Sequence, residues 1–318
     1  MYKQNEKTRR NKIMEETIKN LNKLKKERNA VILAHIYQLP EIHDVADFVG
    51  DSLDLSRKAA QTNADVIVFC GVHFMAETAS ILSPKKKVLI PDVNAGCPMA
   101  DMITAEKLKE FKSQYKNPVV IAYVNTSAMV KAESDICCTS SNAVNVVKSI
   151  ANNSDIIFVP DRNLGEYVQK TSNIKMNIWN GFCPTHNNFI IPEYILKAKK
   201  EHPSAEILVH PECRSEVISL ADYVMSTGIM CRHVAKSAAK EFIIGTEMGI
   251  LYKLKKDNPS KKFYPISHLT ICPNMKKITL AKVLDVLINM KNVISVPENI
   301  RQKAYIPISK MLKIAPQS

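Results

Sequence analysis

Cys-Pro dipeptides occur three times in this chain of 318 residues, and their spacing is nearly constant. They begin at Cys97, Cys183 and Cys272, which are 86 and 89 residues apart. Near-equal spacing of a rare dipeptide indicates an internal structural repeat. The chain is therefore predicted to contain three similar units, each of which ends in a Cys-Pro turn.

Each predicted unit opens with a β-branched apolar run that is typical of a buried parallel strand. The runs read NAVILAHIYQ, NPVVIAYVNT and AEILVHPEC, and they carry His35, Tyr123 and His210 near their ends. These residues precede the next Cys-Pro by 62, 60 and 62 positions. The alternative is chance spacing in an ordinary multi-domain α/β protein, and three further landmarks argue against it.

These landmarks are hydroxyl residues that follow the strand ends by 17 positions, at Ser52, Ser140 and Thr227. Each is predicted to open a helix, where Ser and Thr side chains cap free backbone N–H groups. The same helix ends attract anions. A second strand, a helix and a third short strand are predicted to follow before each Cys-Pro turn.

Alternation of strands and helices predicts an α/β fold with parallel sheets. We expect three similar three-layer αβα domains around a pseudo-threefold axis, with strand ends and Cys-Pro turns facing one central cavity. The predicted divisions are an N-terminal helix at 1–28, units at 29–112 and 113–200, and a third unit at 201–318 that includes a C-terminal helical segment. The apolar face of the N-terminal helix is predicted to consist of Met14, Ile18, Leu21 and Leu24.

The composition excludes several functional classes. The net charge is +13, but the lysines are spread along the chain and aromatic residues are only 6%, so no nucleic-acid partner is expected. Apolar runs long enough to span a bilayer and the apolar stretch of a signal peptide are both missing, so no membrane partner and a cytoplasmic location are predicted. The chain also lacks the glycine-rich motifs of dinucleotide sites and P-loops.

The three Cys-Pro cysteines come singly from distant turns, unlike the paired cysteines of most structural zinc sites. Thiolates hold iron–sulfur clusters, and a cubane bound by only three of them leaves one iron open to a substrate as a Lewis acid. The remaining five cysteines are interpreted as buried thiols; they are Cys70, Cys137, Cys138, Cys213 and Cys231.

Several segments, in this order and spacing, resemble the quinolinate synthase family over about residues 30 to 300. They include AHIYQLPEIHDVADFVGDSLDLS, AGCPMADM, CTSSNA, NGFCPTH, HPEC and CPNMKKITL. The resemblance implies a [4Fe–4S] cluster bound by Cys97, Cys183 and Cys272. It also implies a transferase-type condensing enzyme of de novo NAD biosynthesis, which joins iminoaspartate to dihydroxyacetone phosphate with loss of phosphate and water.

The substrates implied by this resemblance are small anions, so the cavity must contain anion-binding and proton-transferring groups. Candidate catalytic residues are Tyr37, Tyr123, His210 and Glu212. Candidate substrate-binding residues are His35, Ser52, Tyr123, Asn125, Ser140, His186, His210, Glu212 and Thr227. An aspartate-oxidising enzyme is a possible partner that would hand over iminoaspartate.

One residue departs from the family pattern, which commonly reads HYYQ where this chain reads HIYQ. Side chains alternate between the two faces of a strand, so Ile36 should point away from the face shared by His35 and Tyr37. Two alternatives to the family function remain. One is another three-cysteine [4Fe–4S] hydro-lyase acting on a small hydroxy acid. The other is a non-catalytic protein with a structural metal or a nucleic-acid surface.

Overall fold

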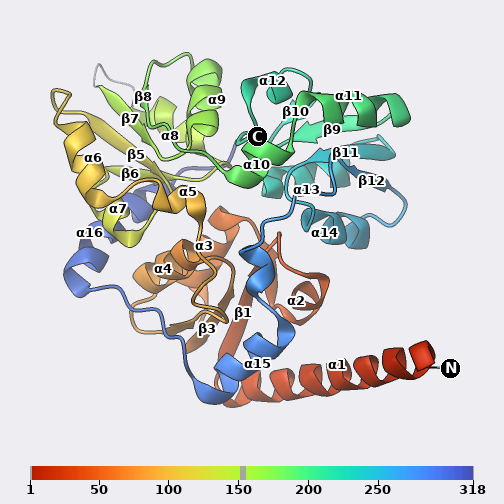
Figure 1. The fold of residues 1–318 in the computed structure, drawn as a ribbon. Helices are drawn as coiled ribbons and strands as arrows, with labels where there is room; N and C mark the ends of the chain where they lie inside the picture. Colours follow the sequence, from red (N-terminus) through yellow and green to blue (C-terminus); the bar gives the residue numbers. More distant parts are fainter. Residues whose placement is uncertain (1, 151–154, 318) are drawn as a thin grey trace.

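The computed structural model describes residues 2–150 and 155–317, and its strands form three parallel sheets of four strands each (Figure 1). The strand orders are β2-β1-β3-β4, β6-β5-β7-β8 and β10-β9-β11-β12, so all three sheets share one topology. This arrangement confirms the predicted α/β class with three similar parallel-sheet units. We call the units that contain β1, β5 and β9 the first, second and third units.

The elements follow one another in the same order in each unit. The first sheet and its helices are β1 (Ala30–His35), α2 (Pro40–Val45), β2 (Phe48–Gly50), α3 (Ser52–Gln61), β3 (Val66–Cys70), α4 (His73–Leu82), β4 (Lys87–Leu89) and α5 (Pro98–Asp101). The second set is α6 (Ala105–Lys112), β5 (Val119–Tyr123), α7 (Ala128–Ala132), β6 (Ile136–Cys138), α8 (Ala143–Ile150), β7 (Ile156–Val159), α9 (Arg162–Ser172), β8 (Asn177–Ile178) and α10 (Pro184–Phe189).

The third set is α11 (Pro192–Glu201), β9 (Glu206–Val209), α12 (Ser215–Ile218), β10 (Tyr223–Val224), α13 (Thr227–Lys236), β11 (Glu241–Gly245), α14 (Ile250–Asp257), β12 (Lys262–Pro265) and the 3₁₀ turn η1 (Met275–Lys277). Each sheet therefore has four strands, where the sequence predicted three. The additional strands β2, β6 and β10 are two or three residues long, too short to show a hydrophobic period.

Equivalent hydrogen bonds recur in all three units and show that the repeat extends to single contacts. An aspartate carboxylate accepts from a strand amide 15 residues earlier, at 2.8 Å in each case: Ile32 to Asp47, Val120 to Asp135 and Ile207 to Asp222. A second recurring bond runs from the amide three residues after β3, β7 or β11 to the carbonyl of the residue two before each Cys-Pro cysteine: His73 to Ala95, Arg162 to Gly181 and Met248 to Thr270. The second bond fixes where each Cys-Pro turn lies relative to its sheet.

The three units meet where the helices after their second strands begin. The hydroxyl of Ser141 donates to Asp51 Oδ2 at 2.6 Å and lies 2.8 Å from the hydroxyl of Ser226. All three side chains are buried, and each comes from a different unit. A Cβ added to Gly228 would lie 2.4 Å from Asp51 Oδ2, so the backbone of the third unit approaches this contact closely. These residues mark the pseudo-threefold axis.

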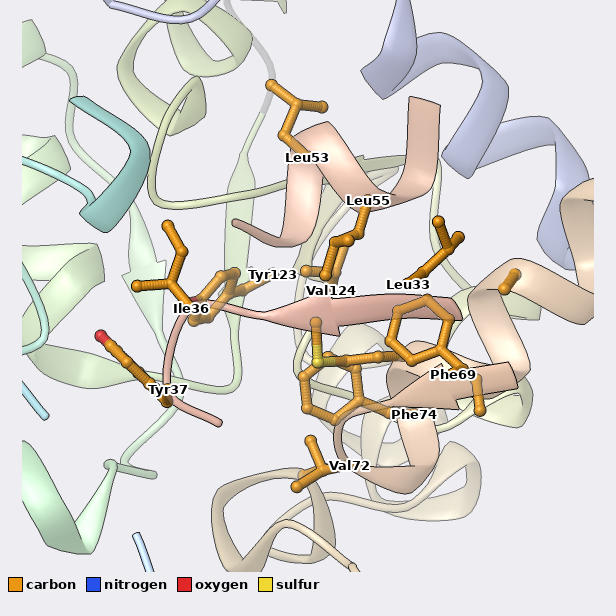
Figure 2. Packing of buried hydrophobic residues seen from close by; sticks show 14 of the residues in the cluster. Leu33, Ile36, Tyr37, Leu53, Leu55, Phe69, Val72, Phe74, Tyr123 and Val124 are labelled. Carbon is orange, nitrogen blue, oxygen red and sulfur yellow. The ribbon is translucent and has the colours of Figure 1, made fainter. Parts of the chain in front are cut away.

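A continuous hydrophobic core joins the units. It includes Leu33 and Leu55 from the first unit and Tyr123 and Val124 from the second, which Figure 2 shows among the packed side chains. Ile36 is 1% exposed and belongs to this core.

The terminal helices pack back onto the first two units. Helix α1 (Tyr2–Glu27) lies against α15 (Leu280–Asn289), and α16 (Glu298–Leu312) lies against α7 and β6 (Figure 1). Leu21 is fully buried, and Ile18 and Leu24 pack against the core, whereas Met14 is 41% exposed. Within the part of the chain that is described, no helix is long and apolar enough to cross a membrane.

Candidate active site

A central cavity of about 210 Å³ lies where the carboxyl ends of the three sheets meet. Every candidate catalytic, substrate-binding or metal-binding residue lines this cavity: His35, Tyr37, Ser52, Cys97, Tyr123, Asn125, Ser140, Cys183, His186, His210, Glu212, Thr227 and Cys272. Crevices beyond the carboxyl ends of parallel strands are where ligands bind in α/β folds. The residues are thus brought together, while their individual roles remain predictions.

His35 and His210 occupy equivalent positions and make the same local contact. The Nδ1 atom of each accepts the backbone N–H of the residue two positions later, Tyr37 or Glu212, at 3.2 Å. A backbone N–H can only donate, so the ring proton of each neutral histidine is on Nε2. Burial lowers the pKa of both histidines to about 3. Both side chains are therefore neutral rings that present an Nε2–H donor, and that of His210 lies 3.2 Å from the Ser140 hydroxyl.

Glu212 is a buried acidic group of the cavity that contacts two other candidate site residues. Its Oε1 accepts from the Tyr123 hydroxyl at 2.5 Å, and its Oε2 lies 2.8 Å from His186 Nδ1. Burial alone would raise the pKa of Glu212, but the adjacent His186 and the hydrogen bonds from His186 and Tyr123 outweigh it and lower this pKa below its ordinary value. Burial and the charge of Glu212 raise the pKa of Tyr123 well above its ordinary value. The pair is thus a buried carboxylate beside a protonated phenol.

A second set of contacts links Tyr37 to His186 through Thr246. The Thr246 hydroxyl lies 2.5 Å from the Tyr37 hydroxyl and 2.8 Å from His186 Nε2. Burial, followed by the charge of Glu212, raises the pKa of Tyr37 well above its ordinary value. Thr246 comes from the end of β11 and is fully buried. This side chain therefore orients two of the predicted site residues at once.

The predicted helix-opening hydroxyls lie in the cavity, but the capping role predicted for Ser52 and Thr227 is wrong, and Ser140 lies three residues before α8 begins. Asp51 caps α3 through the amides of Leu53 and Asp54, so Ser52 is the first helical residue. Ser226 likewise caps α13, and Thr227 follows it. Because the neighbouring residues satisfy the helix amides, the Ser52 and Thr227 hydroxyls are available to a ligand.

Asn125 adds a polar atom that has no partner. Its Oδ1 is buried and, within the described chain, accepts no hydrogen bond, although the residue lines the cavity. Buried polar atoms are nearly always hydrogen-bonded, so an unpaired one in a cavity indicates a ligand contact. This observation favours the predicted binding role of Asn125.

The three Cys-Pro cysteines are partly exposed at this cavity, and the other five line no described part of it. Cys97 and Cys183 directly precede α5 and α10, and neither side chain caps its helix. Burial raises the pKa of all three thiols, that of Cys97 to about 12. A bound metal deprotonates a coordinating thiol outright, so these donors suit a metal centre. Cys183, His186 and Glu212 also bring one ligand atom each within 4.8 Å of one another.

Two buried carboxylates that sequence reasoning missed hold the cysteine turns. Asp161 Oδ2 accepts the amide of Cys183 at 3.2 Å, and Glu247 Oε1 accepts the amide of Cys272 at 3.1 Å. The two acids follow β7 and β11 at equivalent positions, where the first unit has Val72. In the sequence, Asp161 follows Pro160 and Glu247 follows Thr246, each just after a buried strand. This position is the only signal of their role that the sequence offers.

Comparisons with known proteins relate the chain to one family. The family model described as "Quinolinate synthetase A protein" matches residues 19–313. The quinolinate synthase of Dehalococcoides mccartyi is 57% identical over 291 residues, which cover 92% of this chain and 96% of that protein. That of Thermodesulfovibrio yellowstonii is 56% identical over 299 residues, covering 94% and 98%. Quinolinate synthase 2 of Methanosarcina acetivorans is 54% identical over 295 residues, covering 93% and 94%.

These matches span nearly the whole chain, including all three Cys-Pro turns and every residue that lines the central cavity. The chain belongs to the quinolinate synthase family.

Proposed function

We propose that this chain condenses iminoaspartate with dihydroxyacetone phosphate to quinolinate, with release of phosphate and water, as a step of NAD biosynthesis. The observation that carries the proposal is the convergence of three distant cysteines with a His, Tyr and Glu network in one cavity. Family membership supplies the reaction class. The units at 29–112, 113–200 and 201–318 would each contribute one cysteine.

The donor set fits a [4Fe–4S] cluster held by Cys97, Cys183 and Cys272. Thiolates are the usual ligands of such clusters, and these three are the only cysteines among the described residues that line the cavity. When bound, a cluster with three protein ligands supplies an open iron that polarises a substrate oxygen as a Lewis acid.

Substrate carboxylates and phosphate are matched by uncharged donors of the chain. The Nε2–H groups of His35 and His210 and the hydroxyls of Ser52, Ser140 and Thr227 would hold them. Donors fixed in a buried cavity need no reorganisation when charge develops on the substrate. Neutral donors also avoid a permanent salt bridge with the product, which must leave the cavity.

Proton transfer is assigned to Glu212 and Tyr123. We infer that the Glu212 carboxylate takes a proton from a substrate C–H or N–H during enolisation and ring closure. The Tyr123 hydroxyl, which donates to Glu212 Oε1, then delivers a proton to a departing oxygen. Tyr37 would serve the opposite side of the substrate, oriented by Thr246.

The deciding experiment measures quinolinate formation by protein purified without air. Iminoaspartate would be supplied directly, or by an aspartate-oxidising enzyme as the proposed handover partner, together with dihydroxyacetone phosphate. Quinolinate formation with stoichiometric phosphate release is expected. Dehydration of a small hydroxy acid without any quinolinate would instead identify a three-cysteine hydro-lyase.

A further inference from the structure

Cys183, His186 and Glu212 form a compact set of three different metal-binding side chains. His186 Nδ1 lies 3.2 Å from Cys183 Sγ and 2.8 Å from Glu212 Oε2. Zinc binds such donors at about 2.0–2.3 Å, so tetrahedral ligands are roughly 3.4–3.6 Å apart. The two contacts of His186 Nδ1 therefore reach zinc geometry if they lengthen by roughly half an ångström or less, and all three ligand atoms already lie within 4.8 Å of one another.

Each of the three side chains also has an outer partner that fixes its orientation. His186 Nε2 lies 2.8 Å from the Thr246 hydroxyl, which leaves Nδ1 facing the other two ligands. Glu212 Oε1 accepts from Tyr123 at 2.5 Å, which directs Oε2 toward His186 Nδ1, the atom with which it would share a cation. The Cys183 amide is held by Asp161. Ligands oriented by outer hydrogen bonds in this manner are typical of metal sites in proteins.

We propose that the cluster-free chain binds one divalent cation, with Zn²⁺ as the best match, through Cys183 Sγ, His186 Nδ1 and Glu212 Oε2. Binding displaces the thiol proton of Cys183, which is released to solvent as the S–Zn bond forms. Nδ1 of His186 must also give up the proton that it shares with Glu212 Oε2, so the neutral ring keeps its single proton on Nε2, where the Thr246 hydroxyl accepts it. Three protein ligands leave a fourth position for water, as in catalytic zinc sites. Cys97 and Cys272 take no part in this site.

The site has a consequence for the proposed cofactor, and this consequence rests on the proposed function. Cys183 cannot ligate a zinc ion and an iron–sulfur cluster at once. Zinc bound here therefore competes with assembly of the three-cysteine centre. His186 and Glu212 distinguish the two states, because they ligate the single cation and not the cluster.

The experiment titrates the cluster-free full chain with Co²⁺, whose thiolate charge-transfer absorption reports a bond to cysteine. One Co²⁺ per chain is expected, displaced by Zn²⁺. His186→Gln should weaken binding by more than the roughly 10- to 100-fold that loss of an outer partner costs, and Thr246→Val should fall within that range. His233→Gln is the matched control, because His233 Nε2 lies 2.8 Å from Glu206 Oε2 away from the cavity cysteines. It should bind Co²⁺ like the unaltered chain.

Cys272→Ser separates this inference from the proposed function. The variant should keep the cobalt–thiolate band and its affinity, although it should retain no cluster after treatment with iron and sulfide. Loss of the band in Cys272→Ser would show that the cation lies among the three cysteines and would overturn the site. Unchanged affinity in His186→Gln would also overturn it. If cobalt binds as expected but the unaltered chain assembles no cluster, the proposed function fails and the cation site stands.

Competition is tested by reconstitution in the presence of Zn²⁺. One equivalent of Zn²⁺, added before iron and sulfide, should slow cluster assembly in the unaltered chain and have less effect in His186→Gln. Equal slowing in both proteins would contradict competition at this site.

Discussion

The hydroxyl of Tyr123 lies 2.5 Å from Oε1 of Glu212, although the two residues come from different units and are 89 positions apart. Both side chains are buried, at 4% and 3% exposure. The repeat thus brings a proton donor of one unit into contact with a carboxylate of another, and neither unit alone contains this pair.

Removing the Tyr123 hydroxyl tests the proton-transfer assignment. Tyr123→Phe should lower kcat for quinolinate formation by about 10²- to 10⁴-fold, the usual contribution of a general acid or base. Iron content should not change, because the ring still fills its place. The matched control is Tyr252→Phe, which removes a surface bond from a tyrosine to both oxygens of Asp44 at 2.8 Å. Similar kcat values in both variants would refute the assignment.

The buried contact at the pseudo-threefold axis should contribute measurably to stability. Ser141→Ala removes a donor from Asp51 and a partner from Ser226, and leaving buried polar groups unpaired costs about 1–3 kcal/mol. A lower midpoint of thermal unfolding is expected. Ser149→Ala removes only a bond to Val146 O within α8 and should have little effect. Equal midpoints for the two variants would argue that the axis contact is not stabilising.

Glu247 should act as a positioning residue for the third cysteine turn. Its Oε1 accepts from the Cys272 amide at 3.1 Å and from Lys276 Nζ at 2.9 Å, and its Oε2 accepts from Gly249 at 2.7 Å. Glu247→Gln replaces one acceptor by a donor and removes the negative charge that faces Lys276, whose Nζ keeps its bond to Tyr37 O. The affinity for iron should fall by about 10- to 100-fold, as it does when other outer partners of metal sites are lost.

The control for Glu247→Gln is Glu241→Gln, which breaks an exposed ion pair with Lys262. Its iron content should equal that of the unaltered protein. Full iron retention in Glu247→Gln, measured on air-free protein with secondary structure intact, would show that the backbone alone holds the Cys272 turn.

His43 predicts a pH dependence of stability outside the candidate site. Burial lowers the pKa of His43 to about 4, from 6.5 in the unfolded chain. Its Nε2 lies 3.1 Å from Ile36 O, Lys253 and Lys276 add to the lowering, and Asp44 opposes it. Between pH 4 and 6.5 the unfolded chain binds a proton that the folded chain does not. Stability therefore rises with pH across this window and is lost as pH falls.

Denaturant unfolding at several pH values measures this dependence. Each such proton contributes a slope of up to about 1.4 kcal/mol per pH unit. His35 and His210, with pKa values lowered by burial to about 3, add to the slope in the unaltered chain. His43→Gln should reduce the slope by about one proton. An unchanged slope would mean that His43 titrates normally in the folded protein.

The sequence was sufficient to predict that the site residues lie in one cavity, because three periodic signals locate the strand ends and turns. Strand ends are readable from β-branched runs, and cysteine and histidine are rare enough to be noticed. In parallel sheets the strand ends share an edge, so spacing along the chain was sufficient to predict proximity in space.

Thr246, Asp161 and Glu247 were not predictable, because their importance depends on contacts between distant segments. Thr246 touches residues 60 and 209 positions away, and no local pattern distinguishes it from an ordinary threonine. The capping role moved by one residue for a related reason. Asp51 and Ser52 are both good caps in sequence, as are Ser226 and Thr227, so the sequence does not show which residue of each pair caps the helix.

The most direct test of the central claim is iron and sulfide analysis of air-free protein with and without Cys272. The unaltered chain should be brown and hold about four iron and four sulfide per chain, as a [4Fe–4S] cluster requires. Cys272→Ser should remain folded and lose both, while Cys231→Ser, which alters a cysteine outside the cavity, should keep them. A colourless unaltered protein with zinc and no sulfide, or full iron in Cys272→Ser, would contradict a three-cysteine cluster.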